Sequence, residues 1–430
     1  MNFLFVLALV AIGATACAQP KSQAAKSNPV TASQEILPAA HRVQEYIPLL
    51  KGKRVAVFAN QTSTVGDRHL VDVLQENGIV IKVIFGPEHG FRGTADAGEK
   101  VESSKDQKTG APVVSLYGAK KKPTKEDLKD VDLMLFDIQD VGVRFYTYIS
   151  SLQDYMETAI EHNIPLMVLD RPNPNGHYVD GPVLEPQFKS FVGMQPVPVV
   201  YGMTIGEYAQ MLLQEGWLST AAMETYTKNV LAATYPPGAS YFGLTVIPNG
   251  NYTHRSKYQL PVKPSPNMPD MGDIYWYPST CFFEGTVLSE GRGTNKPFQV
   301  FGHPALPKTL YAFTPNPTPG AKSSKHYGAV CYGWNVSGPL EEVEKKVGNR
   351  LQLGYLIKAY EAFPKKDSIF ILPKSGKDSE SFFAKLAGTA ELMTQIRRGA
   401  TEDEIRKSWQ PKLDSFKLVR KKYLLYPDFE

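Results

Sequence analysis

The stretch that decides the fold is "IVIKVIFGPEHGFRG", residues 79–93. It begins with an apolar run rich in β-branched residues, which is typical of a strand buried on both faces of a parallel sheet. It ends in a turn that holds three glycines and two adjacent titratable residues, Glu88 and His89. Because ligands bind beyond the carboxyl ends of the strands in open α/β sheets, this turn is a candidate for chemistry.

The same pattern repeats along the first half of the chain. Apolar runs at 53–60, 131–140 and 164–174 alternate with amphipathic stretches at 67–78 and 148–163. Such an alternation predicts a parallel sheet with helices on both faces. We therefore expect the α/β class, with a doubly wound, Rossmann-like domain.

Beyond residue 265 the sequence changes character. Residues 261–280 are rich in proline, and the segment 327–336, "YGAVCYGWNV", has the composition of a strand. Helical patterns follow near 349–362 and 401–416. These features predict a smaller α+β domain at the C-terminal end.

The length of 430 residues, of which 42% are hydrophobic and 21% charged, is sufficient for two hydrophobic cores. We expect a Rossmann-like catalytic domain over 45–265 and an α+β auxiliary or lid domain over 266–430. Lysine and arginine number 47 and the acidic residues 43, without long blocks of like charge. Nucleic acid is therefore not an expected partner, and a neutral or mildly anionic small substrate is favoured.

The N-terminal residues predict export. Residues 1–18 contain an apolar run that is too short to span a membrane but fits a signal peptide. Residues 19–44 are polar and contain proline, as in a flexible tether. Cys17 lies where a bacterial lipoprotein would be cleaved and acylated, although "Ala16-Cys17-Ala18" also fits ordinary cleavage. The expected location is the periplasm or cell envelope, by a lipid anchor or by simple secretion.

Two cysteines, Cys281 and Cys331, remain after the predicted signal peptide, and they are either one disulfide or two buried thiols. The eight histidines show no ligand spacing, so no metal site is expected. The turn after the first predicted strand reads "ANQTSTVG", residues 59–66, and lacks the glycine pattern that binds a dinucleotide. We therefore expect neither a nicotinamide nor any other cofactor.

Polar residues gather where the predicted strands end. They are Asn60, Glu88, His89, Arg92, Asp137, Asp140, Arg144, Asp170, Arg171 and Asn173. A pair of carboxylates is what glycoside hydrolysis requires, one to protonate the leaving oxygen and the other to attack or to activate water. Each residue alone also has a structural explanation as a helix cap or an ion-pair partner.

Two further stretches carry candidate residues. "FEGTVLSEGRGTNKPFQVFG", residues 283–302, contains Glu284, Glu290 and Arg292, and it is either a lid over the first domain or a surface loop. "RFYTY", residues 144–148, alternates aromatic and polar residues. Its rings either stack on a sugar or pack at the start of a helix.

Together these motifs resemble the exo-β-N-acetylmuramidase (NamZ-like) family. The matching stretches are "GPEHGFRG", "FDIQDVGVRFYTYISSL", "LDRPNPNGHYVDGPVL", "SFVGMQPVPVVYGMTIGEYA", "FFEGTVLSEGRGTNKPFQVFG" and "RKKYLLYPDF". They cover nearly the whole chain from about residue 45 onward. The resemblance implies release of N-acetylmuramic acid from the non-reducing end of peptidoglycan chains, by a Rossmann-like catalytic domain with an auxiliary C-terminal domain.

The resemblance also implies that Glu88 is the catalytic glutamate, which we interpret as the general acid. We expect Asp140 or Asp137 as the second carboxylate, with Asp140 favoured, and His89 and Tyr146 as supporting groups.

The substrate carries a lactyl carboxylate, for which an arginine is the best partner because its guanidinium can bind a carboxylate in a bidentate manner. Arg171 is the first candidate, and Arg144 and Arg292 are the alternatives. The full set of expected substrate contacts is Asn60, Arg92, Arg144, Asp170, Arg171, Asn173, Glu290 and Arg292. Two rival functions remain: a non-catalytic muropeptide-binding lipoprotein, and an acyl-transfer enzyme, for which no activated nucleophile is evident.

Overall fold

The protein is described by a computed structural model in which residues Ile36–Glu430 form one compact unit. The structure describes residues 34–88, 90, 91, 104–231, 242–318 and 320–430. The predicted signal peptide, most of the predicted tether, His89 and Arg92 lie outside the described residues. Within those ranges, no helix has both the length and the apolar character of a membrane span.

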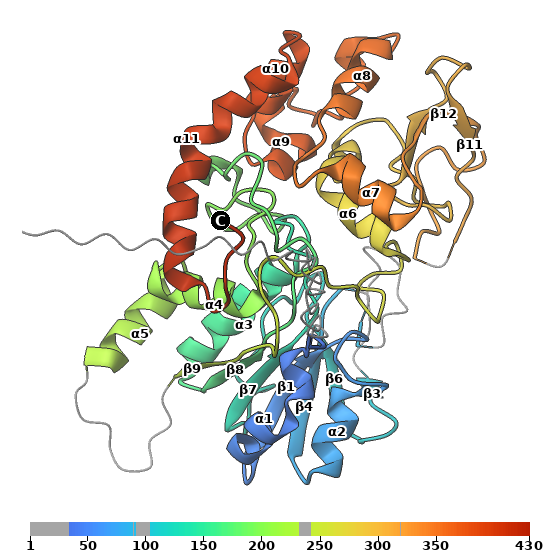
Figure 1. Ribbon diagram of the computed structural model, residues 1–430. Helices are drawn as coiled ribbons and strands as arrows, with labels where there is room; N and C mark the ends of the chain where they lie inside the picture. Colours follow the sequence, from blue (N-terminus) through green and yellow to red (C-terminus); the bar gives the residue numbers. More distant parts are fainter. Residues whose placement is uncertain (1–33, 89, 92–103, 232–241, 319) are drawn as a thin grey trace, which may run out of the picture. The chain divides into compact units, whose positions relative to one another are not determined.

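A seven-stranded sheet forms the centre of the first part of the chain (Figure 1). Its order is β5-β6-β4-β1-β7-β8-β9, and every neighbouring pair is parallel except β5 with β6. The strands are β1 Arg54–Ala59, β4 Val80–Gly86, β5 Ser104–Lys105, β6 Pro112–Ser115, β7 Leu133–Asp137, β8 Leu166–Leu169 and β9 Leu244–Ile247. Numbered along the chain, the parallel strands have the order 3-2-1-4-5-6 of a doubly wound dinucleotide-type sheet, which confirms the predicted fold class.

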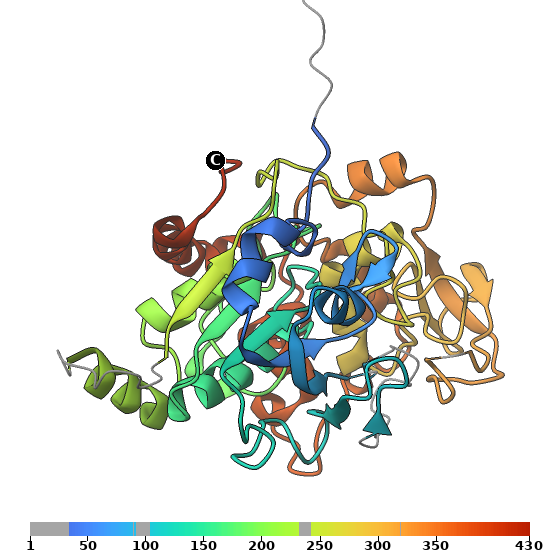
Figure 2. The same cartoon turned by 90° about the horizontal axis from the view of Figure 1, so that it is seen from below.

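Both faces of this sheet are buried, which explains why its strands are apolar throughout. Phe58 and Phe136, on neighbouring strands, touch with ring centroids 5.1 Å apart on one face. Val57 and Leu135 belong to a separate cluster on the opposite face. The first face is covered by α3 Tyr148–Glu161 and α4 Ile205–Gln214, and the second by α1 Val43–Leu50 and α2 Leu70–Glu76 (Figure 2).

The predicted helices 67–78 and 148–163 are thus present as α2 and α3. A short hairpin of β2 Thr64–Val65 and β3 Arg68–His69 precedes α2 and shortens it at its start. Strands β6 and β9 were not expected from the sequence. Both are only partly buried and include proline or polar residues, so they lack the continuous apolar run that marks the equally short β8.

The smaller C-terminal part contains an antiparallel sheet of β10 Val300–His303, β12 Cys331–Asn335 and β11 Tyr311–Phe313. Its helices are α6 Met271–Thr280, α7 Leu340–Val347, α8 Gly354–Ala362, α9 Phe382–Ala387, α10 Glu391–Arg397 and α11 Glu402–Arg420. The predicted strand 327–336 and the predicted helices 349–362 and 401–416 correspond to β12, α8 and α11. The expected α+β character is therefore confirmed.

The two parts of this unit are joined by buried polar contacts. The Arg420 guanidinium donates to the Gly202 carbonyl at 2.8 Å, and Tyr426, near the C-terminus, donates to Asp170 at 2.5 Å. Cys281 and Cys331 are both buried free thiols, which decides between the two alternatives left by the sequence.

Candidate active site

A cleft of about 310 Å³ lies beyond the carboxyl ends of the large sheet. From the sheet side it is lined by Glu88, two residues after β4, by Tyr117, two residues after β6, and by the segment 145–148 between β7 and α3. From the C-terminal part it is lined by Tyr277, Glu284, Arg292, Phe298 and Phe382. Phe191, Val192, Ser265, Asn267 and Met268 complete the lining. This is the edge at which a doubly wound sheet binds its ligand.

Glu88 reaches this cleft because the chain turns immediately after β4. The turn is closed by a hydrogen bond from the Gly90 amide to the Pro87 carbonyl at 3.0 Å. Glu88 is half-buried beside the hydroxyl group of Tyr117. Burial, together with the charge and hydrogen bonding of Glu88, raises the pKa of Tyr117 to about 12, so Tyr117 remains a neutral donor near the carboxylate. Glu88 therefore lines the cleft, at the strand end where the sequence predicts it.

Two further tyrosines stand beside Glu88. The rings of Tyr146 and Tyr148 meet edge to face with centroids 4.8 Å apart, and the Tyr146 hydroxyl donates to the Pro264 carbonyl at 2.8 Å. Burial raises the pKa of both hydroxyl groups above the usual range. Asn60 lies behind them and donates to the Tyr148 hydroxyl at 3.0 Å. Tyr146 thus lines the cleft as expected, whereas Asn60 is fully buried and positions a tyrosine.

The two expected aspartates do not line the cleft. Asp137 is fully buried, and both of its carboxylate oxygens accept hydrogen bonds from Arg171, at 2.6 and 2.8 Å. Asp140 is also buried and accepts hydrogen bonds from the Tyr201 hydroxyl and from the Gly142 amide. Burial raises the pKa of Asp140 to about 7. Both side chains are held by these internal partners and are absent from the lining of the cleft.

The second carboxylate at the cleft is Glu284. It lies in a short 3-10 helix, η3 Cys281–Gly285, that continues directly from α6. Its Oε1 is 2.9 Å from Nη2 of Arg292, which also lines the cleft. Burial raises the pKa of Glu284, although the Arg292 charge opposes this effect. The sequence carried one signal for this residue, its position in the glycine-rich stretch 283–302, which faces the strand-end glutamate.

Glu284 belongs to a cluster of four charged groups. Arg292 also lies 3.6 Å from Glu290, and Lys325 lies 3.1 Å from the other carboxylate oxygen of Glu290. The ammonium of Lys325 donates in addition to four backbone carbonyls between Phe283 and Leu288, at 2.9 to 3.2 Å. Burial raises the pKa of Glu290, but the Lys325 and Arg292 charges together hold it below its usual range. Glu290 is therefore the permanent anion of the cluster.

Glycines hold Arg292 in place. Gly291 and Gly293 have φ values of +86° and +81°, a backbone region that favours glycine. A Cβ at Gly291 would lie 2.3 Å from the Val300 carbonyl oxygen, and one at Gly293 would lie 2.5 Å from the hydroxyl oxygen of Ser324. The turn around Arg292 therefore accepts no larger residue without rearrangement.

The other expected substrate contacts have internal partners. Arg144 is fully buried and donates to the carbonyls of Pro182, Val197 and Leu386 at 2.7 to 2.9 Å. Arg171 is engaged by Asp137. The structure therefore differs from the expectation for both arginines, and of the three candidates only Arg292 lies on the cleft.

Asp170 and Asn173 hold loops together. Asp170 accepts from the Gly206 amide at 2.8 Å and from Tyr426, and burial raises its pKa to about 7. Asn173 donates to the Met203 carbonyl at 2.7 Å. Within the ranges that the structure describes, no cluster of three or more His, Cys, Asp or Glu side chains suits a metal ion.

Several lining residues were missed by sequence reasoning. Tyr117 follows β6, and it would have been found by the strand-end rule if that strand had been recognised. Tyr277 lies in α6 and Phe382 opens α9, in positions where aromatic residues are usually core. Nothing in the sequence marks them as part of a cleft, because only the approach of the C-terminal helices to the sheet edge brings them there.

Comparison with known proteins agrees with this architecture. Residues 55–272 match the model of the N-terminal part of exo-β-N-acetylmuramidase NamZ, and residues 275–426 match its C-terminal part. The chain is 38% identical to the peptidoglycan β-N-acetylmuramidase NamZ of Bacillus subtilis (strain 168), over 99% of both chains.

Two solved structures from Bacteroides fragilis NCTC 9343, both described as DUF1343 family proteins, are also similar. One has a TM-score of 0.79 at 42% identity and covers 92% of this chain and 100% of its own. The other has a TM-score of 0.69 at 28% identity and covers 91% of this chain and 99% of its own. The chain belongs to the exo-β-N-acetylmuramidase NamZ family.

Proposed function

We propose that this protein is an exo-acting glycoside hydrolase that releases N-acetylmuramic acid from the non-reducing ends of peptidoglycan fragments. The observation that carries the proposal is one cleft lined by two glutamates, Glu88 after β4 and Glu284 from the C-terminal part. Glycoside hydrolysis requires two carboxyl groups that flank the scissile bond. Membership of the NamZ family identifies the sugar.

In this proposal Glu88 donates the proton to the leaving oxygen. It follows a central strand in a tight turn and lies beside the neutral hydroxyl of Tyr117. Glu284 supplies the second carboxylate, as nucleophile or as the base that activates water. It acts as an anion, so the neighbouring Arg292 stabilises its working form, whereas burial opposes that form.

Arg292 holds the lactyl carboxylate that distinguishes the muramyl from the glucosaminyl sugar. Its guanidinium has five N–H donors in a planar fork, so it can hold Glu284 and still offer donors to a substrate carboxylate. It is partly exposed at the cleft, with a side-chain exposure of 26%. Tyr146, Phe191 and Phe382 supply aromatic surface for the sugar ring.

The test is hydrolysis of chromogenic β-glycosides of N-acetylmuramic acid and of N-acetylglucosamine by the purified protein. The muramyl glycoside should be cleaved and the glucosaminyl glycoside should be a poor substrate. A series of aryl leaving groups then separates the roles of the two glutamates. A good leaving group needs no protonation, so it should restore turnover in Glu88→Gln and not in Glu284→Gln.

The rival function has a distinct outcome. A non-catalytic muropeptide-binding protein would bind the muramyl glycoside saturably and release no chromophore. That result with folded protein would exclude the hydrolase proposal and retain a role for the cleft in binding.

We also propose that the protein is exported and held at the membrane through Cys17. This rests on residues 1–18 and on the polar segment that follows them. Labelled fatty acid should be incorporated into the protein and not into Cys17→Ser. If the parent protein is released without label, simple secretion replaces the anchor.

A further inference from the structure

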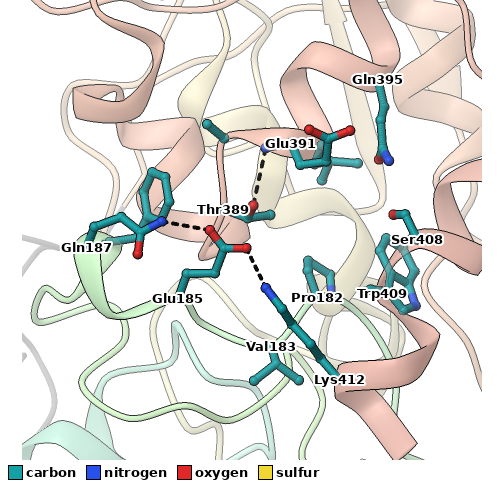
Figure 3. A pocket seen from close by; sticks show the side chains of 13 residues that line it. Pro182, Val183, Glu185, Gln187, Thr389, Glu391, Gln395, Ser408, Trp409 and Lys412 are labelled. Atoms are coloured by element: carbon teal, nitrogen blue, oxygen red, sulfur yellow. Dashed lines mark hydrogen bonds and ion pairs between the residues drawn. The ribbon is translucent and has the colours of Figure 1, made fainter.

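A second pocket, of about 390 Å³, lies away from the residues of the candidate active site. It is formed by the loop 182–188, by α10 and by α11 (Figure 3). Its volume falls within the range of small-molecule sites. Its lining shares no residue with the candidate active site.

Gln395 is the most informative residue of this pocket. It lies on α10, is 2% exposed, and its side chain extends toward Ser408 and Trp409 (Figure 3). Its carboxamide makes no hydrogen bond to any residue that the structure describes. The carboxamide is not among the side-chain groups that are sealed from solvent without a partner, so it remains open toward the pocket. A ligand with one acceptor and one donor would satisfy it.

Two of the charged residues of the pocket pair with each other, and the third, Glu391, is exposed and lies 4.0 Å from Arg398. Lys412 lies 2.6 Å from the Glu185 carboxylate, which also accepts a hydrogen bond from Gln187 at 2.8 Å. An anionic or cationic ligand would have to compete with this ion pair, whereas a neutral ligand would not. The pocket therefore suits an uncharged ligand that is rich in hydroxyl and amide groups.

The apolar part of the lining combines aliphatic and aromatic side chains, among them the ring of Phe188. Val183, Leu392 and Trp409 are all less than 10% exposed and provide two branched aliphatic side chains and one indole. This surface matches a ligand that carries a methyl group beside a polar group. The acetamido group of an N-acetylated sugar has this combination.

We propose that this pocket is a second saccharide site, which binds an N-acetylhexosamine unit of the glycan. The acetamido N–H and carbonyl pair with the Gln395 carboxamide, and the methyl group lies on Val183 and Leu392. Sugar hydroxyls then meet Glu185 and Gln187 at the rim. The choice of an N-acetylated glycan rests on the proposed function.

The position of the pocket suits a substrate that is a polymer. Phe382, at the start of α9, lines the candidate active site, and Thr389, just past its end, lines this pocket. The six residues of α9 span roughly 9 Å, so the two sites are close enough to serve one glycan layer. Binding at the pocket would raise the local concentration of chain ends at the cleft.

The test uses the intact protein labelled with 5-fluorotryptophan and titrated with the disaccharide N,N'-diacetylchitobiose. Of the four tryptophans, Trp409 lines the pocket, and the lining of the candidate active site contains no tryptophan among the described residues. The fluorine signal of Trp409, identified by comparison with Trp409→Phe, should shift saturably. Gln395→Leu, which keeps the volume, should weaken this binding about tenfold, as the loss of one or two hydrogen bonds predicts.

Gln410→Leu is the matched control, because Gln410 is an exposed glutamine of α11 outside the pocket. It should bind the disaccharide like the parent. The other three tryptophan signals report that each variant is folded. If the Trp409 signal does not move while the muramyl glycoside is cleaved, the second site is wrong and the proposed function stands. If a muramyl stem tripeptide shifts the signal and the disaccharide does not, the pocket binds peptide and the saccharide proposal is overturned.

Discussion

Similar residues stand at two pairs of strand ends but have different roles. One pair is β7 and β8, and the other is β4 and β6. After β7 and β8, Asp137 and Arg171 form a bidentate ion pair that is almost fully buried, and Asp140 is turned toward Tyr201. After β4 and β6, Glu88 and Tyr117 remain half-buried on the cleft.

The difference follows from what covers each strand end. Long loops and the C-terminal tail pack over the ends of β7 and β8, and Tyr426 reaches Asp170 there. Among the described residues, Glu88 and Tyr117 after β4 and β6 share a cleft with Glu284 and Arg292. A charged residue at a strand end is therefore a candidate for catalysis only when the segments packed over that strand end leave part of its side chain exposed to solvent.

The most direct test of this comparison is to remove a carboxyl group at each place and to measure the loss of activity. Glu88→Gln and Glu284→Gln should each lower kcat by about 10² to 10⁴, because each removes a carboxyl group that acts in the transition state. Asp140→Asn should stay within a few-fold of the parent, since its side chain does not reach the cleft. Assays with the muramyl glycoside measure all three. A collapse of activity in Asp140→Asn with Glu284→Gln unaffected would reverse the assignment of the second carboxylate.

The arginines should separate in the same way, but by different measurements. Arg292→Ala should lower kcat/KM for the muramyl glycoside. The loss should correspond to about 2 to 5 kcal/mol of binding free energy in the transition state, as expected for a lost charge partner of the substrate. Arg171→Ala should instead destabilise the fold by about 3 to 5 kcal/mol, because it leaves Asp137 buried without its cation. Thermal unfolding and kinetics on both variants distinguish the two effects. Equal kinetic losses with unchanged stability would place Arg171 in the substrate site.

Stability should depend on pH through Asp140. Its pKa is raised to about 7 in the folded protein, against about 4 for an unfolded chain. Between these values the folded state holds a proton that the unfolded state has released, so this contribution to stability is lost as pH rises from 4 through 7. Asp140→Asn should remove the effect and flatten the change in Tm between pH 5 and pH 8 by a few degrees.

The exposed Asp414→Asn on α11 is the control and should leave the Tm profile unchanged. A steeper profile in Asp140→Asn would show that the folded protein keeps this carboxyl ionised.

The smallest expected effect is a shift of the pH profile in Glu290→Gln. The negative charge of Glu290 contributes to the raised pKa of Glu284. Its removal should lower the pKa of Glu284, so the acid limb of kcat/KM should move to lower pH. The acid limb reports the free enzyme, and a profile recorded from pH 4 to pH 8 would detect the change. A limb that stays in place would mean that another group controls it.

Much of the fold could be predicted from the sequence, because the decisive features are local. The apolar runs at β1, β4, β7 and β8 mark strands buried on both faces, and the amphipathic stretches between them mark the helices. The strands β6 and β9 give no such signal, since they are only partly buried and are not apolar throughout.

The site was predicted in part. Glu88, Tyr146 and Arg292 were proposed from the sequence, and they all line the cleft. Glu284 lies in the glycine-rich stretch 283–302, whereas the strand-end rule favours the aspartates after β7 as the second carboxylate. Asp137, Asp140, Arg144 and Arg171 were chosen for their positions and have internal partners instead.

The sequence by itself determined the alternation of strands and helices, the turn after β4 that carries Glu88, and the family. Only the tertiary structure decided which strand ends line the cleft and that Glu284 lines the same cleft as Glu88. Strand and helix patterns depend on neighbours a few residues away, so the chain displays them directly. Whether a charge lies in a cleft or in a buried pair depends on residues hundreds of positions away, and their approach is fixed only when the whole chain packs.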